Sequence, residues 1–424
     1  MFIAHMSDLH YSGDNLVEAD RCFGFAVEEA IKKNAQVAII SGDSTDHRLD
    51  AHSPALLKLA RRLKQLADHC PVFMLQGTFS HEPAGMLHMF ALIGAKHPIV
   101  ISERIEMIAL TEGRWIEYDP VHPEDKYDLV ITSVPTVNKA ELVMTVGAQD
   151  ASEAMGDHLA AVLSSFSHVN GVLRQQGVPT VLVSHGTVDG SLNESGVPMA
   201  GLDHEFTLGA LYSANTDVVM LGHIHKHQSW SRQFAGVSQV IAYPGSVGRF
   251  HYGEIDEKYF LLWDVAPTGS TFEAVITPSK RMIDIDFTGA PDLVKLAEVA
   301  AQCAGAFVRV RYEIDEEYAK TVDRNAIKEI LSTCAEVKIE SCVLTVQRQR
   351  CAGISSLSSV AERFVKWCEF SNTPTDGLIE RISQLQNIDP ELIASEFSKQ
   401  NKVEKHQPKT QIIEEANLFS DVFS

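Results

Sequence analysis

The sequence lacks any apolar run long enough to cross a membrane. Its 424 residues are 45% hydrophobic and 22% charged, which is typical of a globular chain with room for more than one domain. The first residues, MFIAHMSDLH, have neither the basic start nor the long apolar core of a signal peptide, and they predict a first strand instead. We therefore expect no association with membranes.

Patterned cysteines are also missing. The seven cysteines are scattered and form no CxxC pair, which argues against a thiolate metal cluster. An odd, unpatterned set is typical of a reducing compartment. The sequence thus predicts a cytoplasmic protein.

Basic residues are scarce. The chain has 36 Lys and Arg against 56 Asp and Glu, a formal net charge of −20. A protein that grips DNA by itself usually carries a basic face, so this balance argues against strong unaided DNA binding, although it leaves room for a local basic stripe. Clustered carboxylates also suit a cation site, and a solvated acidic surface accounts for most of the excess.

Short apolar runs that end in polar or glycine turns alternate with helical patterns in the first part of the chain. Helical periodicity covers Leu16–Lys33, Ala55–Ala67 and Asp150–Gln176. Strands are expected at Phe2–Met6, Val37–Ser41, Val72–Gln76, Thr180–Ser184, Asp217–Leu221, Gln239–Tyr243 and Tyr259–Val265. This pattern predicts an α/β core with functional loops at the strand ends.

The pattern changes near residue 280. Strand, helix, strand, helix and strand are predicted at Met282–Phe287, Pro291–Ala304, Phe307–Ile314, Asp323–Cys334 and Val337–Val346. Amphipathic helices follow over 357–399, and the end of the chain is polar. We predict four parts: a main domain at 1–278, a small α/β domain at 279–350, a helical segment at 351–400 and a flexible tail at 401–424.

Five short segments place metal-type ligands directly after predicted strands. In chain order they contain Asp8-Leu9-His10, Gly42-Asp43 with Asp46, Gly77 followed by Ser80-His81-Glu82, His185-Gly186, and Gly222-His223-Ile224-His225. Each segment alone is more often a loop or core feature than a ligand set. One cluster at a sheet edge explains all five together. Asp8 and His10 are two residues apart, so an extended backbone would point both to the same side.

The residue types indicate which cation such a cluster would bind. Imidazole mixed with carboxylate suits manganese, iron or zinc, whereas an all-oxygen set would suit magnesium or calcium better. We expect two divalent cations, Mn²⁺ foremost, with Mg²⁺, Fe²⁺ and Zn²⁺ as alternatives.

The five segments resemble the calcineurin-like metallophosphoesterase superfamily, whose signature is D-x-H, G-D, G-N-H-[DE], H and G-H-x-H. Within it the chain looks most like the SbcD-type nucleases of DNA double-strand-break repair, because of HGTVDGSLNES, GHIHKHQ, YPGSVGRF and EKYFLLWDV. The signature covers about residues 1–265. The resemblance implies a metallophosphoesterase β-sandwich flanked by helices, a small capping domain that recognises DNA, and C-terminal helices that dock on an ATPase.

The resemblance also implies the ligands of two cations. One would be held by Asp8, His10, Asp43 and His225. The other would be held by Asp43, His185, His223 and the residue in the family's Asn position. His81 would contact the phosphate and assist the departing oxygen as the catalytic residue. Asp46 is expected to support a ligating histidine from behind, and a loop-capping role is its alternative.

The loop LQGTFSHEP departs from the family pattern. Aligning on His81-Glu82 puts Ser80 in the Asn position with two additional residues after Gly77, whereas aligning on Gly77 puts Thr78 there and misplaces the histidine. We predict Ser80 as the ligand, because this alignment keeps His81. A serine hydroxyl is a poorer ligand than an amide oxygen, so the second cation should bind more weakly. The alternative is a loop that has lost its function.

Three functions follow from these observations. The first is a metal-dependent DNA nuclease, with exonuclease or endonuclease activity, that acts as a homodimer with a coiled-coil ATPase of the SbcC type in DNA repair or processing. The second is a phosphodiesterase or phosphatase for a small substrate. The third is a catalytically weak scaffold for the ATPase. The domain after residue 280 argues against a minimal phosphatase.

Overall fold

The computed structural model describes residues 1–50, 52–120, 126–136, 151–194, 196–199, 205–234, 237–345, 351, 353–392 and 394–395. The chain divides into two compact units, residues 1–344 and residues 345–424, and each is described by itself. The predicted flexible tail at 401–424 lies outside the described residues.

One sheet of the first unit carries the N-terminal strands. Its order is β15-β14-β1-β2-β3-β4. The neighbours β1 to β4 are parallel, and β14 and β15 continue the sheet in antiparallel pairing. The bounds are β1 Phe2–Met6, β2 Val37–Ile40, β3 Val72–Leu75, β4 Ile99–Ser102, β14 Tyr259–Asp264 and β15 Thr271–Ile276.

A second sheet has the order β12-β13-β11-β8-β7-β5-β6. Its centre, β13-β11-β8-β7, is parallel, whereas β12, β5 and β6 pair antiparallel. The bounds are β5 Glu106–Thr111, β6 Arg114–Glu117, β7 Leu129–Val134, β8 Thr180–His185, β11 Val218–Gly222, β12 Gln228–Phe234 and β13 Val237–Tyr243. The short pair β9 (Thr187–Val188) and β10 (Glu205–Phe206) lies apart.

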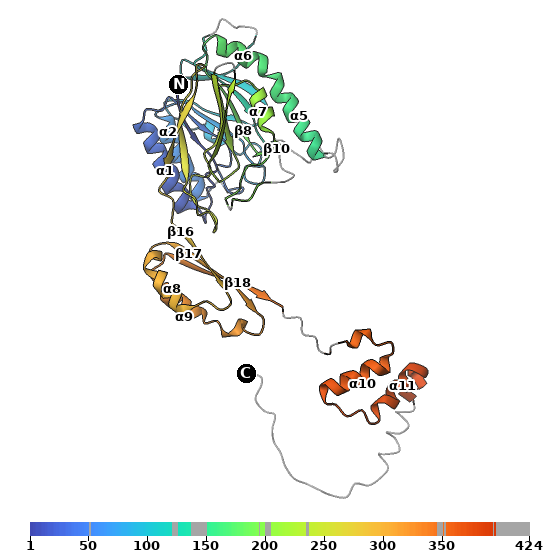
Figure 1. Ribbon diagram of the computed structural model, residues 1–424. Coiled ribbons are helices and arrows are strands. Elements are labelled where there is room, and N and C mark those ends of the chain that lie inside the picture. The colour runs from blue at the N-terminus through green and yellow to red at the C-terminus, as the bar shows by residue number, and fades with distance from the viewer. Residues whose placement is uncertain are drawn as a thin grey trace. The chain divides into compact units, whose positions relative to one another are not determined.

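The two sheets face each other across a shared apolar core. Because side chains alternate along a strand, Ile3 and Ile39 of the first sheet pack with Ile131 and Val183 of the second. Figure 1 shows helices on both outer faces of this sandwich. The outer face of the first sheet packs on α1 (Leu16–Lys32) and α2 (Pro54–Ala67), and that of the second on α5 (Ala151–Ser165) and α7 (Leu208–Ser213).

Two further helices complete this region. Helix α6 (Ser167–Gln175) packs Leu173 against Ala109 and Val130 of the second sheet. The short helix α3 (His88–Ala91) follows β3. The single helix predicted over 150–176 is wrong, because the structure divides it at Phe166 into α5 and α6.

A small α/β part ends the first unit. Strands β16 (Met282–Thr288), β17 (Phe307–Asp315) and β18 (Glu336–Leu344) form a parallel sheet in that order. One face packs on α8 (Leu293–Ala300) and α9 (Arg324–Ile330), with Val308, Val310 and Leu296 at its centre. Short 3-10 turns lie at Ala301–Cys303 and Ala319–Thr321.

The second unit is helical in its described part. After a 3-10 turn at Ile354–Ser356 come α10 (Val360–Ser371) and α11 (Leu378–Asn387). Ser359 and Glu362 form a capping box at the start of α10, which satisfies backbone N–H groups at its first turn. Trp367, Phe370 and Leu385 are 43, 64 and 61% exposed, so apolar surface remains open on these helices.

The predicted fold class is confirmed. The chain is a mixed α/β protein with two facing sheets flanked by helices, a small α/β part and a helical C-terminal part. The bounds of the four predicted parts stay predictions. Within the residues that the structure describes, no helix has the length and apolar character needed to cross a bilayer.

Candidate metal centre

The predicted ligand segments follow neighbouring parallel strands. Asp8 and His10 come after β1 and Asp43 comes after β2, while His185 ends β8 and His223 and His225 follow β11. Backbone hydrogen bonds join the first two loops, from Asp8 N to Gly42 O and from His10 N to Asp43 O, each 3.1 Å. The His223 N–H donates to both carboxylate oxygens of Asp8 at 3.1 Å, which connects the loops of the two sheets.

One group of side chains combines Asp8, His10 and His225. Their ligand atoms all lie within 4.8 Å of one another. The Nε2 atoms of His10 and His225 are 2.9 Å apart. Two ring nitrogens and a carboxylate that converge in this way could hold a divalent cation.

A second group combines Asp43, His185 and His223, again with ligand atoms within 4.8 Å of one another. Nε2 of His185 lies 3.2 Å from Oδ2 of Asp43. Burial alone would lower the pKa of His185, but the Asp43 carboxylate beside it raises that pKa to about 9. Burial lowers the pKa of His223 to about 4, so this ring is neutral at neutral pH, the form in which imidazole binds metals.

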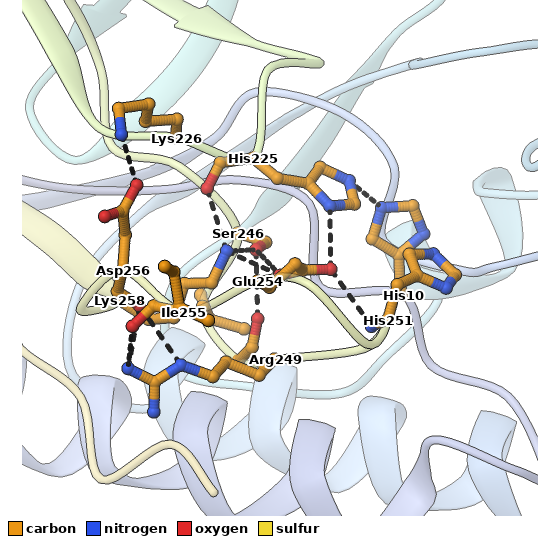
Figure 2. A network of polar contacts seen from close by, with 12 residues as sticks. His10, His225, Lys226, Ser246, Arg249, His251, Glu254, Ile255, Asp256 and Lys258 are labelled. Atoms are coloured by element: carbon orange, nitrogen blue, oxygen red, sulfur yellow. Dashed lines mark hydrogen bonds and ion pairs between the residues drawn. The ribbon is translucent and has the colours of Figure 1, made fainter. Parts of the chain in front are cut away.

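The outer ring nitrogens of three of these histidines face protein oxygens. Nδ1 of His185 lies 2.8 Å from the Ser41 carbonyl, and Nδ1 of His10 lies 3.4 Å from Oδ1 of Asp46. Nδ1 of His225 lies 3.5 Å from Oε1 of Glu254. Figure 2 marks this contact with a dashed line. Such partners leave Nε2 to face the centre of the site, as is usual for metal-binding histidines. Asp46 thus lies where the sequence analysis expected it, and its supporting role stays a prediction.

The backbone at the ligand residues is unusual. Asp8, His10, Asp43 and His223 have φ values of 51, 45, 51 and 101°, in the left-handed region that non-glycine residues seldom adopt. The expected reason for the Asp-x-His spacing is therefore wrong: the two side chains reach the site from left-handed positions, not from an extended strand. Backbone strain of this kind gathers at functional sites.

Glu82 and Gly77 hold the loop at residues 77–82 against the loop that contains Asp43. The buried Glu82 carboxylate accepts hydrogen bonds from Ser44 N at 2.5 Å and Gly77 N at 2.6 Å. A Cβ atom at Gly77 would lie 2.3 Å from both the backbone nitrogen and Oδ1 of Asp43. The glycine is therefore required for the close approach of the two loops, and Glu82 fixes it.

Thr78 occupies the place expected for Ser80. The backbone N–H of Thr78 donates to Oδ1 of Asp43 at 2.7 Å, and its hydroxyl lies 3.2 Å from Oδ2 of Asp43 and 3.4 Å from Nε2 of His185. Ser80 is exposed, and across the described ranges its side chain has no hydrogen bond to the ligand residues. The ligand role of Ser80 stays a prediction that its position does not support.

His81 nevertheless reaches the site. Its ring lies 5.1 Å from that of His10 in an edge-on arrangement, and its ligand atom groups with those of His10 and Asp46. Its backbone is fixed by hydrogen bonds from His81 N to Thr78 O and from Thr45 Oγ1 to His81 O. The two additional residues form a turn that lets Thr78 and His81 both face the cluster.

Sequence reasoning missed several residues around the site. Glu254 and Lys258 lie in a loop four residues apart, a spacing that reads as a surface pair, yet both are buried. Thr78 is not predicted as the contact of Asp43, because a single alignment keeps either Gly77 or His81 in place and the structure accommodates both. The position of Glu254 between a glycine turn and an apolar strand was the available signal for the pair.

The arrangement defines a class of site: carboxylate and imidazole groups at strand ends, able to hold metal ions in a mixed α/β fold. No known protein-family model and no curated protein sequence matches the chain. Among solved structures, a dimetal phosphatase from Danio rerio is 11% identical, and the match covers 64% of this chain and 98% of that chain at a TM-score of 0.40. A likeness of this degree carries no conclusion about activity.

Proposed function

We propose that this chain is a metal-dependent phosphoesterase that hydrolyses DNA phosphodiesters with two divalent cations. The observation that carries the proposal is the pair of groups Asp8/His10/His225 and Asp43/His185/His223 at neighbouring strand ends, with His81 beside them. Mixed imidazole and carboxylate donors suit manganese, iron or zinc, and we propose Mn²⁺ as the bound cation with Mg²⁺, Fe²⁺ and Zn²⁺ as alternatives.

The chain's own residues divide the chemical work. When bound, two cations of this kind acidify a water nucleophile and offset the charge that develops on the phosphate. Asp43 lies between the two groups, since it pairs with His185 and its carbonyl accepts from His10 N. His81 is half-buried, and within the described part of the chain its Nδ1 has no hydrogen-bond partner. We propose that this ring contacts the phosphate and assists the departing oxygen.

DNA as the substrate and an ATPase as the partner rest on the resemblance of the motifs to SbcD-type nucleases. The net charge of −20 favours a second protein that supplies much of the grip on DNA. The exposed Trp367, Phe370 and Leu385 offer apolar surface on α10 and α11 for docking such a protein. In this proposal the nuclease works as a homodimer with a coiled-coil ATPase in DNA repair or processing.

A small-substrate phosphodiesterase is the second candidate, and one observation favours it. On the sheet of the small α/β part, Arg309 pairs with Asp284 and Arg311 with Asp286, each through two hydrogen bonds. Lys338 lies 2.6 Å from Glu340 in the same sheet. These cations are neutralised by neighbouring carboxylates, which suits a surface that does not hold phosphates.

The decisive experiment compares the two substrates in one preparation. Full-length chain would be incubated with Mn²⁺, Mg²⁺, Fe²⁺ or Zn²⁺ and either labelled single- and double-stranded DNA or bis(p-nitrophenyl) phosphate. We expect Mn²⁺-dependent DNA cleavage that a chelator stops, that His81→Ala loses, and that the control His168→Ala on α6 retains. Cleavage of only the small diester under every metal condition, with and without a coiled-coil ATPase, would replace the first proposal by the second.

A further inference from the structure

A buried ion pair lies directly behind the predicted ligand His225. Glu254 and Lys258 are 0 and 2% exposed, and their Oε2 and Nζ atoms are 2.5 Å apart. Removing two charges from water is costly, and apolar residues of similar size are often at least as stable in such places. Stabilisation of the fold therefore does not explain why this pair is buried here, and we consider a role at the candidate metal centre.

The contacts of this pair converge on His225 (Figure 2). Glu254 Oε1 lies 3.5 Å from Nδ1 of the His225 ring and accepts from the backbone N–H of His251 at 3.0 Å. Lys258 Nζ donates to the His225 carbonyl at 3.0 Å and to Ser246 Oγ at 2.9 Å. The ring and the backbone of one histidine are thus both held by one buried pair.

This geometry selects a tautomer of His225. A carboxylate can only accept, so Nδ1 of His225 carries the proton that faces Glu254. The lone pair is then on Nε2, the atom that lies 2.9 Å from Nε2 of His10 and groups with Asp8. Fixing the tautomer in this way presents the correct nitrogen to a cation.

The loop that carries Glu254 is also attached to the small α/β part. The Tyr252 hydroxyl donates to Oε1 of Glu336 at 2.8 Å. The charged ends of Lys338 and Arg309 lie 5.4 and 5.8 Å from the centre of the Tyr252 ring. Glu336 begins β18, so this end of the loop rests on the small sheet while its other end supports the candidate metal centre.

Arg249 braces the same loop from within. Its guanidinium donates to the carbonyls of Ile255 and Asp256, and also to that of Lys280 at 2.7 Å. The Arg249 and Lys280 N–H groups both donate to Oε1 of Glu18, at 3.1 and 2.7 Å. The loop therefore joins helix α1, the start of the small part and His225 in one polar network.

We propose that residues 249–258 form a positioning loop. Glu254 orients the ring of His225 for cation binding, and Tyr252 ties that support to the small α/β part, so that the seating of the small part influences cation affinity. This inference rests on the two-cation site of the proposed function and is independent of whether DNA is the substrate.

The first test measures Mn²⁺ binding by calorimetry on the full chain, without substrate. Glu254→Leu alone would leave the Lys258 charge buried and unpaired, and Glu254→Gln would keep an oxygen able to accept from Nδ1 of His225. The informative variant therefore combines Glu254→Leu with Lys258→Met. We expect this protein to unfold as cooperatively as the wild type and to lose about 10- to 100-fold in affinity at one of its two cation sites. Unchanged affinity at both sites in the folded double variant would overturn the proposal.

Ile255→Ala is the matched control, because it removes a largely exposed side chain from the same loop and keeps the backbone carbonyl that accepts from Arg249. We expect wild-type Mn²⁺ affinity from it. A loss as large as that of the double variant would assign the effect to the loop surface, not to Glu254.

A second readout needs no cation. Long-range ¹H–¹⁵N spectra of the neutral His225 ring, assigned with His225→Gln, should show Nδ1 protonated in the wild type and a mixture of tautomers in the double variant. A wild-type ring protonated on Nε2 would contradict the proposal. If the wild type bound no Mn²⁺ at all, the proposed function would fail while this measurement still tested the role of Glu254.

The link to the small part is tested with two tyrosines. Tyr252→Phe removes the hydrogen bond to Glu336, whereas Tyr259→Phe removes an equivalent bond, of 2.9 Å to Glu257, that involves neither Glu254 nor the small α/β part. We expect Mn²⁺ affinity to fall about 2- to 10-fold in the first, the equivalent of one ordinary hydrogen bond, and to stay unchanged in the second. Equal affinities in the two variants would remove Tyr252 from the proposal.

Discussion

The Thr78 hydroxyl lies 3.2 Å from Oδ2 of Asp43, and the Thr78 N–H donates to Oδ1 of the same carboxylate at 2.7 Å. Thr78, the residue directly after Gly77, thus fixes the carboxylate of Asp43, which lies between the two ligand groups. Ser80, two residues further on, is exposed. The two hydroxyl residues of one loop can therefore be compared directly.

Removing the Thr78 hydroxyl should weaken Mn²⁺ binding, because Asp43 then loses a hydrogen bond to a charged group, worth about 1.5 kcal/mol or roughly tenfold in affinity. Thr78→Ser should keep most of the wild-type affinity, and Ser80→Ala should match the wild type. Calorimetric titration with Mn²⁺ measures all three. A greater loss in Ser80→Ala than in Thr78→Ala would restore Ser80 as the ligand.

Replacing His81 should separate catalysis from cation binding. His81 lies beside His10 but belongs to neither of the two main groups, so His81→Ala should lower kcat by about 10²- to 10⁴-fold, the usual contribution of a positioned acid or base. Its Mn²⁺ affinities should remain close to those of the wild type. Loss of one bound Mn²⁺ in this variant would make His81 a ligand instead of the catalytic residue.

The close approach of two loops makes Gly77 intolerant of a side chain. Gly77→Ala would place a Cβ atom 2.3 Å from the Asp43 backbone nitrogen, so the loops must separate. We expect a loss of activity and of Mn²⁺ affinity together, with overall folding retained. Gly94→Ala is the control, since a Cβ atom there meets no atom within 4 Å. Wild-type kinetics in Gly77→Ala would show that the loops are not held this closely.

Helices α1 and α2 are joined by an ion pair that should make stability depend on pH. Asp20 accepts from Arg62 Nε at 2.9 Å and from Lys58 Nζ at 3.3 Å. Burial alone would raise the pKa of Asp20, but Arg62 and Lys58 lower it below its usual range. A carboxyl whose pKa is depressed by folding contributes stability above its unfolded pKa of about 3.9 and loses that contribution as pH falls.

Asp20→Asn should therefore cost about 1 kcal/mol at neutral pH, and its difference from the wild type should narrow in acid. Urea unfolding at a series of pH values measures this. Asp68→Asn is the control, because the pair of Asp68 with Lys64 is exposed and should contribute little. A difference that grew in acid would contradict the assignment of the Asp20 charge.

The sequence predicted the strands that carry the site, as well as β13, β14 and the three strands of the small part, but it missed β4 to β7. The runs at β1, β2, β3, β8 and β11 are apolar, short and followed by motif residues, which made them visible. Strands β4 to β7 are not followed by motif residues. Strand β6 (Arg114–Glu117) is mostly exposed, so it shows no apolar periodicity in the sequence. The helix over 150–176 was predicted unbroken because Phe166 is apolar and continues the pattern.

The positions of the ligand residues could be predicted from the sequence, but the residues that contact and orient these ligands could not. Asp8, His10, Asp43, His185, His223 and His225 were placed by their order after strands, and the structure brings them together. Glu254 lies 29 residues from His225 in sequence, and only tertiary packing brings the two into contact. Thr78, and not Ser80, contacts Asp43, because a turn accommodates two residues without moving the histidine, which alignment alone does not reveal.

The left-handed backbone at Asp8, His10, Asp43 and His223 lowers the stability of the fold while it places these side chains in the candidate site. Each such residue costs the native state on the order of 1 kcal/mol that a more permissive residue would recover. In the presence of a metal chelator, the variant His10→Asn should therefore unfold at no lower urea concentration than the wild type, although it lacks one predicted metal-binding side chain. If it unfolds much earlier, the histidine is part of the scaffold; if it does not, the left-handed backbone at His10 serves the site and not the stability of the fold.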